Sequence, residues 1–286
     1  MFHIQILNKS NLITDAELKP IVAALQKQVD EHFAPAYHLS AKLVLTDKDN
    51  GMTPIHIVDS VADAPSGALA WHDVDNKGRP FGIIPMKIVR KDRAHPGPTI
   101  SHELLELMAD PGCELYRLTL WPPKSQRQAS VAYEVCDPVE DNEYPIKTTA
   151  GTAKVSNFVL PSWFLPESKR PWDHLKKLTA PLKMTHGGYL QWHRTGTHWR
   201  TINAKHVRAY RAKPHYFSRT VRRLRNMQEL LYPGYHEMVR EAALRLRSSG
   251  AGPEAIEALA DHLVTTLGRD PRPSVDKLVS RLLKRK

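Results

Sequence analysis

The sequence has few of the features that stabilise secreted proteins or anchor membrane proteins. Its only cysteines are Cys113 and Cys136, which excludes a framework of several disulfides. We interpret both as reduced thiols, with a single bridge between them as the alternative. No apolar run approaches the roughly 18 residues of a spanning helix, and the opening MFHIQILNKS lacks the apolar stretch of a signal peptide. We therefore expect a cytoplasmic protein without membrane contact.

Several catalytic motifs are also missing. The chain contains no glycine-rich phosphate loop, no serine nucleophile elbow and no cysteine-protease signature. Nucleotide hydrolysis and covalent acyl transfer therefore have little support. The enzyme chemistry that remains is attack by a water molecule that a metal ion activates.

Composition and charge divide the chain into two parts. With 41% hydrophobic and 25% charged residues, its 286 residues resemble an average soluble globular protein. The net charge is +11, and residues 205–286 hold 18 basic against 8 acidic side chains, so they carry nearly all of the excess. We predict a metal-binding domain over residues 1–204, followed by a basic linker and a helical module over residues 205–286.

Short strands and helices alternate in the first part. Apolar patterning predicts strands at residues 1–7, 41–47 and 54–60, and two more within 68–89 around an Asn-Lys-Gly turn. Helical spacing predicts helices at 14–33 and 100–109, the second capped by Thr99 or Ser101. Loops and short strands are expected over 113–170, and a hairpin over 187–204. Together these elements predict an α+β fold with a small mixed sheet.

The helix at 100–109 carries a metal-binding pattern. Residues four apart on a helix share a face, so His102 and Glu106 can hold one ion while Glu103 lies near the open coordination position. The same logic underlies His-Glu-x-x-His zinc peptidases, in which the intervening glutamate takes a proton from water. The alternative is that these side chains are solvated, because acidic residues favour the first turn of a helix.

The segment His102-Glu103-Leu104-Leu105-Glu106, within a strand, helix, strand, strand order over residues 1–140, resembles the zincin-like metallopeptidase superfamily. The resemblance implies a zincin-like mixed sheet with an active-site helix and an edge strand that binds extended substrate. It also implies that His102 and Glu106 are zinc ligands and that Glu103 is the general base. The sequence departs from the family at Glu106, which replaces histidine and makes the ion less Lewis acidic; Mn or Fe would also tolerate this oxygen-rich set.

A third protein ligand has to come from elsewhere in the chain. The acidic cluster at 133–141 is the best source, with Glu134 favoured and Asp137 second. Asp110, eight residues after His102, could bind the ion or orient His102 through its ring nitrogen. The alternative for the cluster is turn chemistry, because acidic residues beside proline commonly cap turns.

Other candidate residues have simpler interpretations. Cys136 has no partner at zinc-finger spacing, so we interpret it as a small buried apolar residue. Three further histidines are isolated in the sequence, and we interpret them as hydrogen-bonded surface residues: His72, His95 and His186.

The C-terminal part combines basic and aromatic side chains in a way that suits phosphate contacts and stacking. These residues are Arg208, Tyr210, Arg211, Lys213, His215, Tyr216, Phe217, Arg219, Arg222, Arg223 and Arg225. Nucleic acid is therefore one possible partner, and a solubilising linker is the alternative. The last helix has an apolar stripe between Val275 and Leu283, which is expected to pack on the preceding helices.

Taken together, these patterns predict a zinc-dependent, peptidase-like hydrolase with a peptide or protein substrate. A water molecule between the metal and Glu103 would attack an amide carbonyl. The alternative from a different class is a non-catalytic assembly protein that binds nucleic acid or protein and uses a metal only to stiffen its fold.

Overall fold

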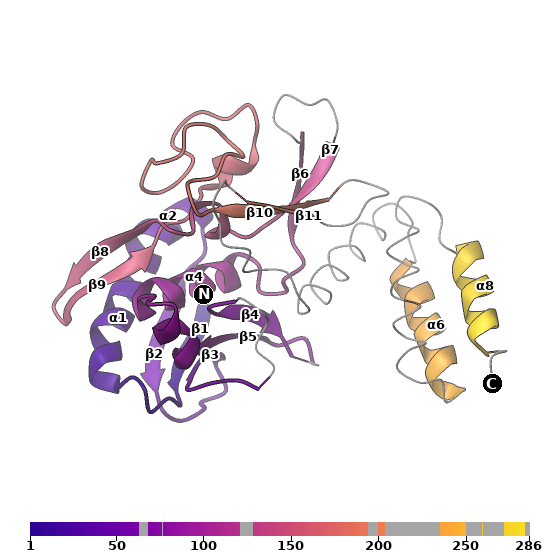
Figure 1. Cartoon of the computed structure of the whole chain (residues 1–286), viewed down its shortest axis with the longest axis horizontal. Coiled ribbons are helices and arrows are strands. Elements are labelled where there is room, and N and C mark those ends of the chain that lie inside the picture. The colour runs from indigo at the N-terminus through magenta and orange to yellow at the C-terminus, as the bar shows by residue number, and fades with distance from the viewer. Residues whose placement is uncertain are drawn as a thin grey trace.

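The computed structural model describes residues 1–62, 68–75, 77–120, 128–193, 200–203, 235–249, 259 and 272–283. A five-stranded sheet with the order β2-β1-β3-β5-β4 forms one layer of the N-terminal part (Figure 1). Its strands are β1 (Phe2–Asn8), β2 (Ala41–Thr46), β3 (Thr53–Val58), β4 (Trp71–Val74) and β5 (Pro80–Pro85). Neighbouring strands are parallel except β4, which is antiparallel to β5. The predicted α+β class with a mixed sheet is confirmed.

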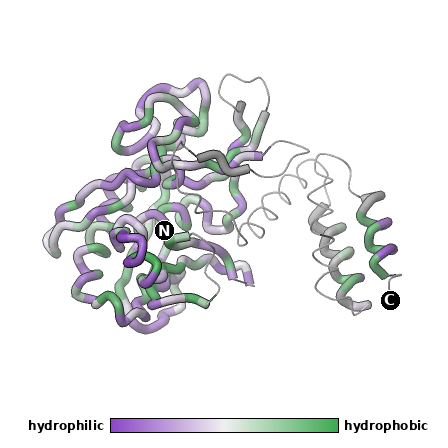
Figure 2. The backbone as a smooth tube through the Cα atoms, in the orientation of Figure 1, coloured by the Kyte–Doolittle hydropathy of each residue, from purple (hydrophilic) through white to green (hydrophobic). Residues whose placement is uncertain are grey.

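The first helix, α1 (Asp15–Gln28), packs on β2 and on a later hairpin. It begins with a capping box, in which the Thr14 hydroxyl accepts the N–H of Glu17 and the Glu17 carboxylate accepts the N–H of Thr14. Figure 2 shows hydrophobic and hydrophilic segments alternating along it, as expected for a helix with one buried face. A π-helical turn at Val29–Phe33 and the short α2 (Ala34–Tyr37) continue it towards β2.

The helix that carries the metal-binding pattern is α4 (Pro96–Ala109), which follows α3 (Met86–Lys91). The prediction that it starts after Thr99 or Ser101 was wrong, because proline at its first position sets the helical φ angle four residues earlier. The Thr99 hydroxyl instead donates a 2.9 Å hydrogen bond to the His95 carbonyl. Gly97 lies against the Lys154 carbonyl with no room for a Cβ atom, so only glycine allows this close approach.

The second half of this part contains two further sheets (Figure 1). The strands β6 (Tyr116–Leu120), β7 (Gln128–Ala132), β10 (Tyr189–His193) and β11 (Arg200–Asn203) form an antiparallel sheet in the order β11-β10-β7-β6. This confirms the predicted pairing of the segments that became β10 and β11. The hairpin β8 (Glu143–Thr148) and β9 (Gly151–Ser156) packs on α4, which also contacts β4 and β5. Short 3₁₀ turns lie at Asp137–Val139 and Pro161–Phe164.

Two described helices lie near the C-terminus, α6 (Tyr235–Ser248) and α8 (Arg272–Leu283). They pack on one another through buried side chains at Ala242, Leu246, Val275 and Val279, in a cluster that also contains Leu259. The expectation that the last apolar stripe packs on preceding helices is therefore confirmed. The predicted boundary near residue 205 and the basic and aromatic cluster at 208–225 lie outside the described residues. Within the described part of the chain, no helix combines the length and apolar character needed to cross a bilayer.

Candidate metal centre

The polar face of α4 is buried rather than solvated. Apart from its two prolines, every residue of the helix is buried, and His102, Glu103 and Glu106 are only 7%, 4% and 3% exposed. The apolar residues of α4 join the main core, so the helix is enclosed on its polar and apolar sides alike. Charged side chains are rarely buried to this degree unless they are paired or bind a metal. The interpretation of these residues as solvated charges is therefore wrong.

Two carboxylates converge on one ring nitrogen of His102. The Nε2 atom lies 3.3 Å from Glu106 Oε2 and 3.1 Å from Asp137 Oδ1. The other ring nitrogen, Nδ1, lies 3.8 Å from Glu140 Oε2. Because an imidazole nitrogen carries at most one hydrogen, Nε2 can donate to only one of the two oxygens that face it. Such an arrangement is typical of ligands around a cation.

The segment after β7 fixes both carboxylates. The backbone N–H groups of Cys136 and Asp137 donate to Glu106 Oε1 over 3.1 and 3.3 Å, which leaves Oε2 directed at the imidazoles. The Tyr189 hydroxyl, at the start of β10, donates to Asp137 Oδ1. Gly188 precedes it, and its backbone lies too close to the Pro138 carbonyl to leave space for a Cβ atom. Glycine at this position thus lets β10 approach the turn that carries Asp137.

A second histidine joins the site from β4. His72 is fully buried, and its Nδ1 lies 3.3 Å from Glu103 Oε2 and 3.8 Å from Glu106 Oε2. Its Nε2 lies 3.9 Å from Glu134 Oε2. The described donor atoms therefore fall into two groups that could each hold a cation, one formed by His72, Glu106 and Glu134 and the other by His102, Asp137 and Glu140. Glu106 Oε2 also lies 3.3 Å from His102 Nε2, so Glu106 is placed to serve either group.

Burial and mutual repulsion change the proton affinities in the site. Burial, together with Asp137 and Glu134, raises the pKa of Glu106 to about 7, although His102 opposes this shift. Burial alone would lower the pKa of His102, but Glu106, Glu140 and Asp137 outweigh it and hold that pKa well above its usual range. In the metal-free protein these groups therefore retain protons that a bound cation would displace.

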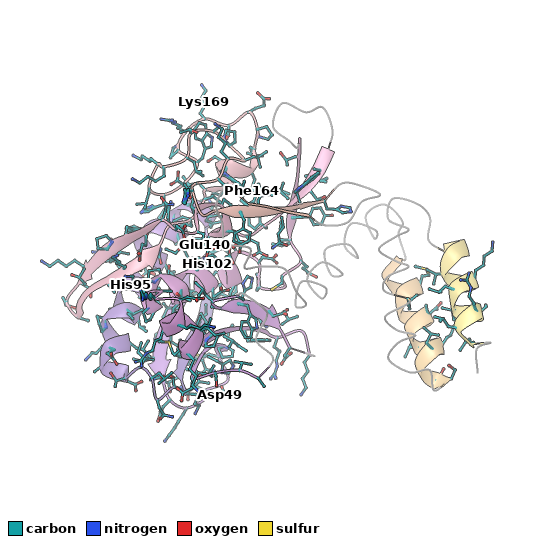
Figure 3. All side chains as sticks on the ribbon, in the orientation of Figure 1. Asp49, His95, His102, Glu140, Phe164 and Lys169 are labelled. Atoms are coloured by element: carbon teal, nitrogen blue, oxygen red, sulfur yellow. The ribbon has the colours of Figure 1, made fainter. Side chains whose placement is uncertain are left out.

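An open cavity of about 380 Å³ reaches the site. His102, Glu103 and Glu140 form part of its wall, and Figure 3 shows His102 and Glu140 beside one another. The remaining wall comes from the segment before α4, the first turn of α4, the segment before β4 and the region of the β8–β9 hairpin: Leu69, Asp92, Arg93, Ala94, His95, Pro98, Thr99, Asp141, Glu143 and Ser156. A molecule in this cavity would therefore lie against His102 and Glu103.

The structure brings most of the predicted site residues together. Glu103, Glu106, Glu134 and Asp137 all lie within 4 Å of one of the two imidazoles. Asp110 is placed differently. It is fully buried, and its two carboxylate oxygens accept the N–H groups of residues 114 and 115, so it closes the turn after α4. It belongs to neither ligand group.

Sequence reasoning missed His72 and Tyr189, and it included Glu140 only as a member of the acidic cluster at 133–141. His72 was interpreted as a surface residue, but it is buried and lies 30 residues before the α4 motif that it contacts. The strand pattern around it contained one usable signal, because a polar side chain in an otherwise apolar segment needs a buried partner. Cys136 and Cys113 are both buried free thiols, as expected, and burial raises the pKa of the Cys136 thiol well above its usual range.

Comparison of the chain with models of known protein families, with curated proteins and with solved structures gives no match. The functional argument therefore depends on the geometry of the site.

Proposed function

We propose that this chain is a metal-dependent hydrolase of the zincin-like metallopeptidase type, with zinc bound by His102, Glu106 and Asp137. The observation that carries the proposal is the convergence of two carboxylates on His102 Nε2, at 3.1 and 3.3 Å, beside a cavity that Glu103 also lines. It combines a ligand set with a candidate base and with space for a substrate.

The separations between the donor atoms suit zinc. With zinc-to-ligand distances of 2.0 to 2.2 Å, the edge of a coordination tetrahedron is about 3.3 Å long. The distances from His102 Nε2 to Glu106 Oε2 and to Asp137 Oδ1 match this edge. Three protein ligands and a fourth open position are the usual arrangement of a catalytic zinc site. Tyr189, through its hydrogen bond to Asp137, supplies the outer contact that such ligands commonly have.

The chain's own residues have distinct roles in the proposed reaction. A bound ion would polarise the scissile carbonyl and lower the pKa of a water molecule. Glu103, on the cavity wall, accepts a proton from the attacking water and returns it to the leaving nitrogen. His72, 3.3 Å from Glu103 Oε2, keeps that carboxylate in place. The burial of all three side chains of the α4 motif keeps bulk water from screening these interactions.

The fold is compatible with the proposal. The edge strand of the five-stranded sheet, β4, is antiparallel to its neighbour and carries His72, and α4 packs against both strands. This supports the zincin-like arrangement in which an active-site helix lies beside an edge strand.

Metal analysis combined with a peptide-cleavage assay tests the proposal. The purified full-length protein should retain zinc after dialysis, and Glu106→Gln and Asp137→Asn should each lose the ion bound at His102. Glu103→Gln should keep the zinc that wild type binds at the His102 ligands while its kcat falls by about two to four orders of magnitude. Glu143→Gln is the matched control for metal content, because it makes the same change on the cavity wall outside both ligand groups.

Two outcomes would contradict the proposal. If wild type binds no metal under any loading condition, the convergence of His102, Glu106 and Asp137 has another explanation. If metal is bound but cleavage of a mixed peptide library is the same for wild type and Glu103→Gln, the chain is not a hydrolase of this type.

A further inference from the structure

Two imidazoles face the same carboxylate oxygen. Glu106 Oε2 lies 3.3 Å from Nε2 of His102 and 3.8 Å from Nδ1 of His72. The proposed zinc ligands account for His102 and Asp137, but they leave His72 and Glu134 unused. His72 Nε2 nevertheless lies 3.9 Å from Glu134 Oε2, next to the Glu106 carboxylate.

These two residues form a ligand group together with Glu106. One ring nitrogen of His72 and one oxygen from each of Glu106 and Glu134 lie within 4.8 Å of one another. Glu103 Oε2 flanks the group, 3.3 Å from His72 Nδ1. The residues come from three separate elements, since His72 is on β4, Glu106 is on α4 and Glu134 follows β7. Nothing in the local sequence requires their convergence, so it is a product of the tertiary fold.

The spacing of this group suits a six-coordinate cation better than a four-coordinate one. An octahedral ion with ligands at about 2.1 Å separates them by about 3.0 Å when they are neighbours and about 4.2 Å when they are opposite. The 3.9 Å separation between His72 Nε2 and Glu134 Oε2 lies within this range and exceeds the tetrahedral edge. Glu106 Oε2 lies 3.8 Å from the other ring nitrogen, Nδ1, and a single ring nitrogen of His72 lies within 4.8 Å of an oxygen from each glutamate. Mixed imidazole and carboxylate ligands are suited to Mn²⁺ among the octahedral divalent ions.

The burial of the group favours a bound cation. His72 is 0% exposed, and Glu103, Glu106 and Glu134 are 3% to 4% exposed. Three carboxylates therefore surround one imidazole in a medium of low dielectric constant, where their mutual repulsion is strong. A divalent ion between them would reduce this repulsion and would share the Glu106 carboxylate with the zinc ligands.

We propose that His72, Glu106 and Glu134 form a second divalent-cation site, so that Glu106 bridges two ions in a dinuclear centre. The inference rests on the proposed function, because the first ion is the one assigned to His102, Glu106 and Asp137. Paired ions in such centres lie about 3.5–4 Å apart and act together on the attacking and leaving groups of one substrate.

Counting bound ions tests the inference without any activity measurement. Metal-free full-length protein is titrated with Zn²⁺ and with Mn²⁺, bound metal is measured by elemental analysis, and bound Mn²⁺ is also counted by electron paramagnetic resonance. Wild type should bind two ions per chain. Glu134→Gln and His72→Gln should each bind one, and Asp137→Asn should keep the ion at His72. Glu143→Gln is the matched control and should bind two.

The possible results are distinguishable. One ion in wild type, with no change in Glu134→Gln, overturns the second site and leaves the proposed hydrolase intact. No bound ion in wild type overturns both proposals. Circular dichroism and thermal melting show whether each variant folds. If His72→Gln does not fold, Glu134→Gln decides the question, because it is nearly isosteric and changes only charge and ligand strength. Two ions retained by a folded Glu134→Gln would overturn the inference.

Discussion

Replacing Glu106 by glutamine should have opposite effects on stability with and without metal. In the metal-free protein the pKa of Glu106 is raised from 4.5 to about 7, mainly by burial and then by Asp137. At pH 8 the folded protein therefore ionises Glu106 at a cost that the unfolded chain does not bear. Since one pKa unit corresponds to about 1.4 kcal/mol, the shift represents about 3 kcal/mol of lost stability.

Glutamine removes this cost but keeps part of the local structure. Its side-chain oxygen can still accept the N–H groups of Cys136 and Asp137, and His102 retains Asp137 and Glu140 as partners. We expect metal-free Glu106→Gln to be about 1–3 kcal/mol more stable than metal-free wild type at pH 8. The advantage should shrink as the pH falls from 7 towards 4.5. In that range the folded wild type takes up a proton on Glu106 that the unfolded chain does not bind.

Metal reverses the order. Zinc at about 1,000 times its dissociation constant stabilises a protein by about 4.1 kcal/mol, which exceeds the advantage of the metal-free variant, and the variant lacks a ligand that both proposed ions share. Urea unfolding followed by circular dichroism at pH 8, in EDTA and in zinc, measures both differences. The reasoning is refuted if Glu106→Gln is less stable than wild type in EDTA, or if zinc stabilises both proteins equally.

Three further predictions concern the surroundings of the site. Tyr189→Phe removes the hydroxyl that donates a hydrogen bond to Asp137. Its zinc affinity, measured by competition with a chelator, should fall about 10-fold or more. An unchanged zinc affinity would show that this contact is unimportant. Burial, aided by His32, lowers the pKa of His174 from 6.5 to about 4, so the unfolded chain binds a proton first as the pH falls. Melting temperature should therefore decrease between pH 6.5 and 4, and His174→Gln should lose much of that decrease; parallel curves would contradict this. Ser101→Ala removes the hydroxyl that donates to Gln28 Oε1 and accepts the backbone N–H of Ser156. Urea unfolding should show that the free energy of unfolding falls by about 1–3 kcal/mol, and a decrease below about 0.5 kcal/mol would contradict this prediction.

Local patterns in the sequence were sufficient for the regular elements that depend on near neighbours. The strands of the mixed sheet, the first helix and the i, i+4 pair on α4 all follow from spacings of a few residues. The start of α4 was misplaced because the predicted caps, Thr99 and Ser101, lie inside the helix, which Pro96 begins. The pairing of β10 with β11 was also predictable, because the two apolar segments are close in the chain.

Only the tertiary structure decided what the polar face of α4 contacts. The same spacing that aligns His102 with Glu106 would be found on a solvated helix, and the distinction depends on β4 and the segment after β7 closing over that face. His72 lies 30 residues before α4, and Tyr189 lies 52 residues after Asp137. Contacts of this range are set by how sheets and helices pack, because helical periodicity describes which residues share a face but not what covers it.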